Sequence, residues 1–159
     1  MTDKFGHLSI LRSDGRQSET ALAIQRGVAS LLKAHNYVLL TEFILPSGRR
    51  ADVIALGGDG QIWIIEIKSS ATDFHADEKW PEYLEYCDRF SFAIPMTMNE
   101  ALIPIEAGLI VADAYGAEVL RDVGRPQLHP ARRKTLSLAF ARVAAARLQA
   151  AWEAGMNVL

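Results

Sequence analysis

The chain has 159 residues, of which 50% are hydrophobic and 23% are charged, and this is the make-up of an ordinary globular domain with one core. Its formal net charge of −2 gives no overall attraction for nucleic acid, so any nucleic-acid binding needs a local basic groove or a bound metal. The single cysteine, Cys87, excludes an internal disulfide and is typical of a reducing compartment, so we expect a cytoplasmic protein. We also expect no signal peptide and no membrane span, because the longest aliphatic runs are only as long as a strand.

The first half of the chain predicts a helix followed by a three-stranded antiparallel meander. Asp14 and Gln17 form a capping box, which places a helix over residues 15–35, after a loosely ordered lead-in of residues 1–13. Segments rich in β-branched and aromatic residues then indicate strands over residues 37–45, 49–56 and 61–68, with turns at residues 46–48 and 57–60.

The second half predicts further strands and a long final helix. We expect a loop over residues 69–77, a helix over 77–89, a strand over 90–94, an irregular segment over 95–107, a strand over 108–112 and an edge strand over 117–122. The final helix should run from Pro130 to about Ala154, with an apolar stripe of Leu136, Phe140, Val143 and Ala144. Arg147 also falls in this stripe, and the sequence pattern does not explain a charged residue there. The order of elements predicts one α/β domain over residues 1–159, with helices on both sides of a mixed central sheet.

Two charged side chains end the most apolar strand of the sequence. Residues 62–65 are all apolar, so both faces of this strand are apolar, which is typical of a buried central strand. Glu66 and Lys68 follow and share one face, because side chains alternate along a strand. Burying an unpaired charge is costly, so we expect the two to pair with each other or to hold a cation.

Turn geometry brings other acidic residues to the same place. If the second hairpin is centred near residue 59, Asp52 lies directly across from Glu66, and a first hairpin centred near Ser47 places Glu42 across from Asp52. A slip of one residue would turn the side chains of a strand to the other face. In this register Glu42, Asp52 and Glu66 form an acidic row across three strands, with Lys68 at its end.

Such a row indicates a divalent-metal site. Neighbouring carboxylates repel unless a cation lies between them, and Mg²⁺ (or Mn²⁺) suits one or two carboxylates plus a phosphate. The expected ligands are Asp52, Glu66 and the backbone carbonyl of Ile67, with Glu42 as an additional candidate. The cation would polarise a scissile phosphate and activate a bound water, while Lys68 would orient that water or neutralise developing charge. The alternative is a purely structural ion pair between Glu66 and Lys68.

Asp52 followed by Glu66-Ile67-Lys68 at the end of the next strand resembles the Asp…Glu-x-Lys signature of PD-(D/E)xK nucleases. The proline that usually precedes the aspartate is replaced here by Ala51. The resemblance implies a restriction endonuclease-like fold with an αβββαβ core and a mixed central sheet flanked by helices, to which this chain adds the long C-terminal helix. It also implies that Asp52, Glu66 and Lys68 are catalytic residues.

A resemblance to the MmcB family of bacterial DNA repair proteins covers most of the chain. It rests on the stretches Gly48–Val53, Ile62–Ser70, Asp77–Tyr83, Tyr86–Phe90, Gly108–Ala117 and Ala131–Lys134. This resemblance implies a nuclease-like role in the repair of damaged DNA, with DNA and other repair proteins as partners. A homodimer is a further expectation from the fold, although no coiled-coil pattern or interface stripe is evident in the sequence.

Several residues near this signature are candidates for DNA contact. Arg50 and Ser69 flank the acidic row, and Lys79 and Tyr83 lie on the segment that follows it. Two of them have a structural alternative: Arg50 can pair with Glu42, and Tyr83 belongs to residues 80, 83 and 87, which have core-facing spacing. Two further candidates are Glu19, as an auxiliary acid on the first helix, and the basic run 132–134, which either meets phosphates or is a solvated face.

Three functions fit these observations. The leading prediction is a Mg²⁺- or Mn²⁺-dependent deoxyribonuclease, a phosphodiester hydrolase acting in DNA repair. The second is a non-catalytic module on the same scaffold that binds DNA or repair partners, which the weak net charge favours. The third is an RNA-processing nuclease, because the same chemistry acts on RNA.

Overall fold

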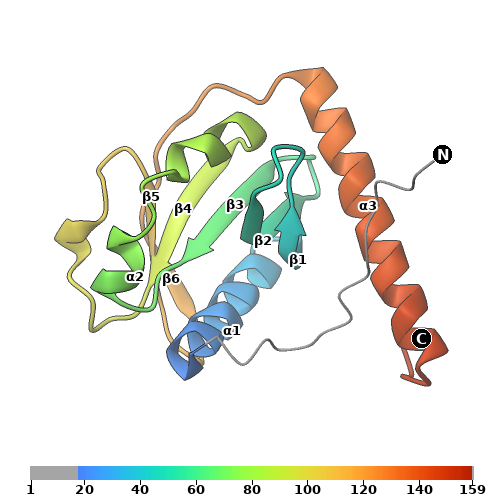
Figure 1. The fold of residues 1–159 in the computed structure, drawn as a ribbon, viewed down its shortest axis with the longest axis horizontal. Coiled ribbons are helices and arrows are strands. Elements are labelled where there is room, and N and C mark those ends of the chain that lie inside the picture. The colour runs from blue at the N-terminus through green and yellow to red at the C-terminus, as the bar shows by residue number, and fades with distance from the viewer. Residues whose placement is uncertain (1–17, 159) are drawn as a thin grey trace.

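The structure is a computed structural model that describes residues 18–158 (Figure 1). Helix α1 (Glu19–Ala34) is followed by strands β1 (Tyr37–Ile44), β2 (Arg50–Gly57) and β3 (Ile62–Ile67). The short helices α2 (Ala71–His75) and η1 (Trp80–Tyr86) lead to β4 (Arg89–Ile94), and η2 (Glu100–Leu102) leads to β5 (Gly108–Ala112). Strand β6 (Ala117–Arg121) and the long helix α3 (Pro130–Glu153) complete the described chain.

The six strands form one mixed sheet in chain order, β1 to β6. Strands β1, β2 and β3 are the predicted antiparallel meander. Strand β4 then pairs parallel to β3 and β5 parallel to β4, whereas β6 returns antiparallel as an edge strand. The carboxyl ends of β3, β4 and β5 therefore lie at one edge of the sheet, and the site described below lies there.

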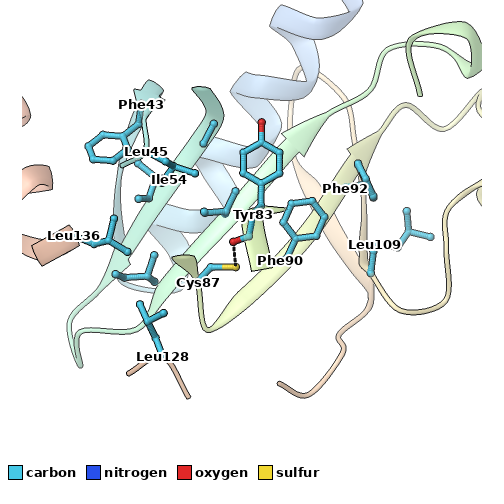
Figure 2. Packing of buried hydrophobic residues seen from close by; sticks show 14 of the residues in the cluster. Phe43, Leu45, Ile54, Tyr83, Cys87, Phe90, Phe92, Leu109, Leu128 and Leu136 are labelled. Carbon is cyan, nitrogen blue, oxygen red and sulfur yellow. Dashed lines mark hydrogen bonds between the residues drawn. The ribbon is translucent and has the colours of Figure 1, made fainter. Parts of the chain in front are cut away.

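Each face of the sheet is covered by helices, as the sequence predicted. Helix α1 covers one face, where Ile24, Val28 and Leu32 pack on Val53, Trp63 and neighbouring strand residues. Segments η1 and α3 cover the other, and Figure 2 shows part of that cluster. Its members include Phe43, Ile54, Tyr83, Phe90, Phe92 and Leu136. Both faces of β3 are thus buried, which explains its continuous apolar run.

Cys87 is a buried residue of the hydrophobic core. Its thiol donates to the Tyr83 carbonyl at 3.4 Å, and the same contact is drawn in Figure 2. Burial raises the pKa of this thiol to about 12, so it is protonated and unreactive at neutral pH.

The structure differs from the sequence predictions in three local ways. Helix α1 is capped by Ser18, whose hydroxyl accepts the Ala21 N–H at 3.1 Å; the predicted Asp14 cap and the lead-in lie outside the described residues. Residues 69–77 are not all loop, because Ser70 caps the short helix α2. The helix predicted over 77–89 is instead the 3-10 segment η1, which ends at Tyr86, because Cys87 is already extended.

The early end of η1 has a clear cause in the residue that follows it. Asp88 accepts the backbone N–H groups of Ile62 and Leu128, both at 2.8 Å, and both terminal guanidinium nitrogens of Arg133 at 2.7 Å. These four bonds hold Asp88 against the sheet, so the chain leaves the helix before it.

None of the helices within residues 18–158 is long and apolar enough to cross a membrane.

Candidate active site

Strands β2 and β3 part at the point where two carboxylates meet. Their backbone pairing runs as far as Val53 and Ile65, and Asp52 and Glu66 are the next pair in that register. The Asp52 N–H donates to Glu66 Oε1 at 3.0 Å, and the Ile67 N–H donates to Asp52 Oδ2 at 2.8 Å. Each carboxylate therefore satisfies a backbone donor of the other strand, which fixes the orientation of both side chains.

Burial makes this pair of carboxylates electrostatically costly. Burial and the nearby charge of Asp52 raise the pKa of Glu66 to about 8. Burial likewise raises the pKa of Asp52 to about 6, although the hydrogen bond from Ile67 and the charge of Lys68 oppose this rise. Near neutral pH the pair therefore retains a proton or attracts a cation.

Lys68 lies beside this pair in a network of alternating charge. Its side chain is buried, and Nζ lies 3.0 Å from Asp77 Oδ2. The other oxygen of Asp77 lies 3.3 Å from Arg49 Nη2. The buried ammonium of Lys68 is therefore paired with Asp77. The sequence had suggested Glu66 as its partner in a structural ion pair.

Glu42 occupies the third place in the acidic row but is paired with a cation. The pairing of β1 with β2 has Thr41 opposite Val53 and Phe43 opposite Ala51, so Glu42 lies across from Asp52 as predicted. Its carboxylate lies 2.6 Å from Arg50 Nε, which is the salt bridge that we considered as an alternative. Burial is the main cause of the raised pKa of Asp52, and the negative charge of Glu42 adds to it. Glu42 therefore acts on the site electrostatically even though it is paired with Arg50.

The backbone at Glu42 explains the unexpected arginine of α3. Glu42 has a φ of 53°, in the left-handed region, where strand geometry is interrupted. Arg147 donates to the carbonyl oxygens of Thr41 and Glu42, at 2.7 and 3.3 Å. Arg147 therefore belongs in the inward stripe of α3, because it satisfies carbonyls at the strained part of β1.

The candidate DNA contacts fall into two groups. Lys79 and Arg50 are exposed, and Ser69 is half-buried with its N–H donating to Asp73 Oδ2 at 3.1 Å. Tyr83, in contrast, is buried, its ring stacks on Phe90, and its hydroxyl donates to the Arg50 carbonyl at 2.9 Å. The structure thus favours the core role for Tyr83 that the aromatic spacing indicated.

The remaining charged candidates either have protein partners or are exposed. Arg133 is held by Asp88, and Arg132 donates to the Glu85 carbonyl at 2.9 Å, so the two arginines of the basic run have protein partners. Lys134 is exposed on the first turns of α3, and Glu19 is exposed at the start of α1.

Sequence reasoning missed two acidic residues of the site. The charges of Asp73 and Asp77 help to raise the pKa values of Asp52 and Glu66 respectively, after burial, and Asp77 holds Lys68. Both residues lie in the segment that was expected to be a plain loop. The signal that could have found them is their position directly after a strand that ends in Glu-x-Lys.

The geometry is suited to a cation with oxygen ligands. Hydrogen bonds engage Oδ2 of Asp52 and Oε1 of Glu66, which leaves Oδ1 and Oε2 for a metal ion. The Ile67 carbonyl points to the same side as its N–H, toward Asp52, because both groups of a strand residue face one neighbour. Residues 18–158 contain no cluster of three or more Asp, Glu, His or Cys side chains that could hold an ion. Water and phosphate would therefore have to complete the shell, as is usual for Mg²⁺.

The raised carboxyl pKa values predict an unusual pH dependence of stability. At pH values between the ordinary pKa of a glutamate and about 8, the folded state binds more protons at Glu66 than the unfolded chain does. In EDTA, the free energy of unfolding is therefore expected to fall by roughly 1–3 kcal/mol as pH rises through this window. Glu66→Gln should remove most of that slope. Urea unfolding over a pH series checks this, with the exposed Glu106→Gln as control; equal slopes in all three proteins would contradict it.

Comparison with known proteins gives two matches. A family model described as "DNA repair protein MmcB-like" matches residues 10–155, a range that includes every residue of the site. Among solved structures, the chain is similar to the SPO1766 protein of unknown function from Silicibacter pomeroyi, at 46% sequence identity and a TM-score of 0.82. That similarity covers 89% of this chain and 98% of the other. None of the curated proteins matches the chain.

Proposed function

Because this chain belongs to the MmcB-like family of DNA repair proteins, we propose that it is a divalent-metal-dependent nuclease that hydrolyses phosphodiester bonds of DNA during repair. The family supports the role in DNA repair, and the site supports the chemistry. The observation that carries the proposal is the pair of Asp52, which is half-buried, and Glu66, which is buried, each held in a fixed orientation by a backbone N–H of the other's strand. An acidic pair at this depth destabilises the fold unless it binds something positive.

Each residue of the site has a distinct part in the proposed reaction. Asp52, Glu66 and the Ile67 carbonyl hold Mg²⁺ or Mn²⁺, and that ion supplies Lewis-acid polarisation of the phosphate and a water of lowered pKa. Lys68 places a positive charge where the phosphate oxygens gain negative charge. Lys79 and Arg50 are the exposed cations near this edge that can meet the DNA backbone.

The test is cleavage of matched substrates. The protein is incubated with single-stranded, duplex and branched DNA, and with an RNA of the same sequence, in Mg²⁺ or Mn²⁺. The proposal expects cleavage of at least one DNA in metal and none in EDTA or with Asp52→Asn. Asparagine keeps an oxygen that accepts the Ile67 N–H, so the variant tests charge rather than folding. Cleavage of no DNA, or undiminished cleavage by the variant, would overturn the proposal, and preference for RNA would support the RNA-processing alternative.

A second candidate is a non-catalytic module that binds DNA or repair partners. Two observations favour it: the net charge is −2, and residues 18–158 have no acidic cluster larger than the pair that could hold an ion. This alternative predicts DNA binding that is independent of Lys68 and no heat of Mg²⁺ binding in calorimetry.

The buried contact of Asp77 gives a further prediction for the proposed nuclease. Asp77→Ala should lower kcat about 10- to 100-fold with little change in KM, because Lys68 Nζ loses the partner that positions it at 3.0 Å. Steady-state cleavage at several DNA concentrations separates the two constants. The control is Glu82→Ala, which removes the more exposed partner of Arg49 and should change neither constant appreciably. A rise in KM at constant kcat would instead place Asp77 in DNA binding.

A further inference from the structure

Helix α3 has a second apolar stripe, on the side that faces away from the domain. Its inward stripe, with Leu136 and Phe140, packs on the sheet. The outward stripe consists of Leu138, Ala141, Ala145, Leu148 and Trp152, all of them exposed. The three large side chains are 56%, 51% and 65% exposed respectively. Figure 1 shows α3 at one margin of the molecule, with the sheet on one side of it only.

The spacing of this outward stripe is that of a coiled-coil seam. Its members follow one another at intervals of three, four, three and four residues, which is the a/d pattern of two heptads. Soluble proteins ordinarily expose apolar side chains singly, whereas these five lie next to one another along one helix face. Such a contiguous apolar surface indicates an interaction site. The pattern was not evident from the sequence, because the inward stripe of the same helix interleaves with it.

The outward stripe is self-complementary when it is reversed. The central part reads Leu138, Ala141, Ala145, Leu148, and the order leucine, alanine, alanine, leucine is the same in either direction. Two antiparallel copies therefore place Leu138 opposite Leu148 and Ala141 opposite Ala145. The small central residues let the helices approach closely, and leucine pairs close the seam on both sides.

The same register also matches the ends of the seam. It places Lys134, one heptad before Ala141, opposite Trp152 of the other copy. An ammonium over an indole face is a favourable cation–π pair, and the two-fold symmetry supplies it twice. A symmetric dimer uses one patch on both subunits, so such matching of a surface to itself points to a second copy as its partner.

We propose that the outward stripe of α3 forms a two-fold antiparallel dimer with a second copy of this chain. Stable interfaces bury about 800 Å² per partner. One helix face supplies less than that, so we expect a dissociation constant in the micromolar range. The dimer is independent of the proposed nuclease chemistry, because no residue of the stripe belongs to the carboxylate site.

Sedimentation velocity from about 5 to 200 µM tests this dimer. The wild-type protein should shift from monomer to dimer over this range, and Ala145→Glu should remain monomeric while keeping the circular dichroism spectrum and melting temperature of the wild type. Ala101→Glu, at an exposed alanine on η2, is the matched control and should dimerise normally. A wild-type monomer at every concentration, or equal dimerisation of both variants, would overturn the proposal; the former would leave the stripe to a different protein.

Cross-linking tests the orientation of the two helices. A mixture of Ala141→Cys and Ala145→Cys chains should form the mixed disulfide in preference to either like pair, because the antiparallel register places these positions opposite each other. Preference for like pairs would indicate a parallel dimer and would overturn the proposed geometry.

Discussion

Replacing Glu66 with glutamine is expected to lower metal-dependent DNA cleavage by about 10³-fold, or about 4 kcal/mol of transition-state stabilisation. The substitution removes the charge that would hold the ion and leaves the shape of the side chain. The glutamine amide would keep an oxygen that can accept the Asp52 N–H, a bond of 3.0 Å in the wild type. The effect should therefore fall on kcat and on metal affinity rather than on folding.

The same substitution should stabilise the protein in EDTA above neutral pH. Burial and the charge of Asp52 raise the pKa of Glu66 to about 8, so ionising this group works against the fold. Loss of activity with gain of stability is the signature of a site residue that is strained for function. Cleavage rates with and without Mn²⁺ measure the loss of activity. Urea unfolding in EDTA at pH 8.5 measures the gain of stability.

Glu42→Gln is the matched control for this pair of effects. Glu42 is exposed and bonded to Arg50, so its replacement should change the cleavage rate less than 10-fold. The interpretation fails if Glu66→Gln retains more than a tenth of wild-type activity, or if it is less stable than wild type in EDTA.

Asp88→Ala should be the most destabilising substitution on the other side of the molecule, at about 3–5 kcal/mol. Asp88 accepts two backbone N–H groups and pairs with both terminal guanidinium nitrogens of Arg133. Its removal leaves the N–H groups of Ile62 and Leu128 without their acceptor and takes the ion-pair partner from Arg133, which keeps only its bonds to backbone carbonyls. Burial raises the pKa of Asp88, but the bonds from Arg133 and the backbone outweigh it and hold that pKa below its usual value.

Urea unfolding at pH 7 measures this loss, and a double-mutant cycle assigns it. Because the pKa of Asp88 is lowered, its contribution is present above the ordinary carboxyl pKa and is lost as pH falls through the folded value. Asp88→Ala and Arg133→Ala together should cost less than the sum of the single changes. Asp122→Ala, which breaks a more exposed pair with Arg89, should cost under about 1 kcal/mol. A loss below that level for Asp88→Ala would contradict the account.

The sequence predicted the elements that follow from periodicity and turns. The meander was predictable because turns at residues 46–48 and 57–60 separate its strands, and hairpins centred on these turns bring Asp52 to Glu66. The long helix α3 was predictable from Pro130 and its inward stripe. Both predictions rest on local rules that operate over a few residues.

The features that were missed depend on contacts between distant segments. The end of η1 is set by the contacts of Asp88 with β3 and α3, and no local signal marks it. Asp77 reaches Lys68 only because α2 and η1 fold back over the end of β3. The role of Arg147 depends on the left-handed backbone at Glu42, which is a departure from strand geometry.

The central claim is that a divalent ion binds between Asp52 and Glu66, and paramagnetic broadening by Mn²⁺ in ¹⁵N-labelled protein tests it most directly. The amide signals of Asp52 and Ile67, whose N–H groups donate to the two carboxylates, should broaden first as Mn²⁺ is added at low stoichiometry. Excess Mg²⁺ should restore them, and Glu66→Gln should show no selective broadening. Uniform weak broadening across the protein, or selective broadening centred elsewhere, would contradict the metal site on which the proposed nuclease depends.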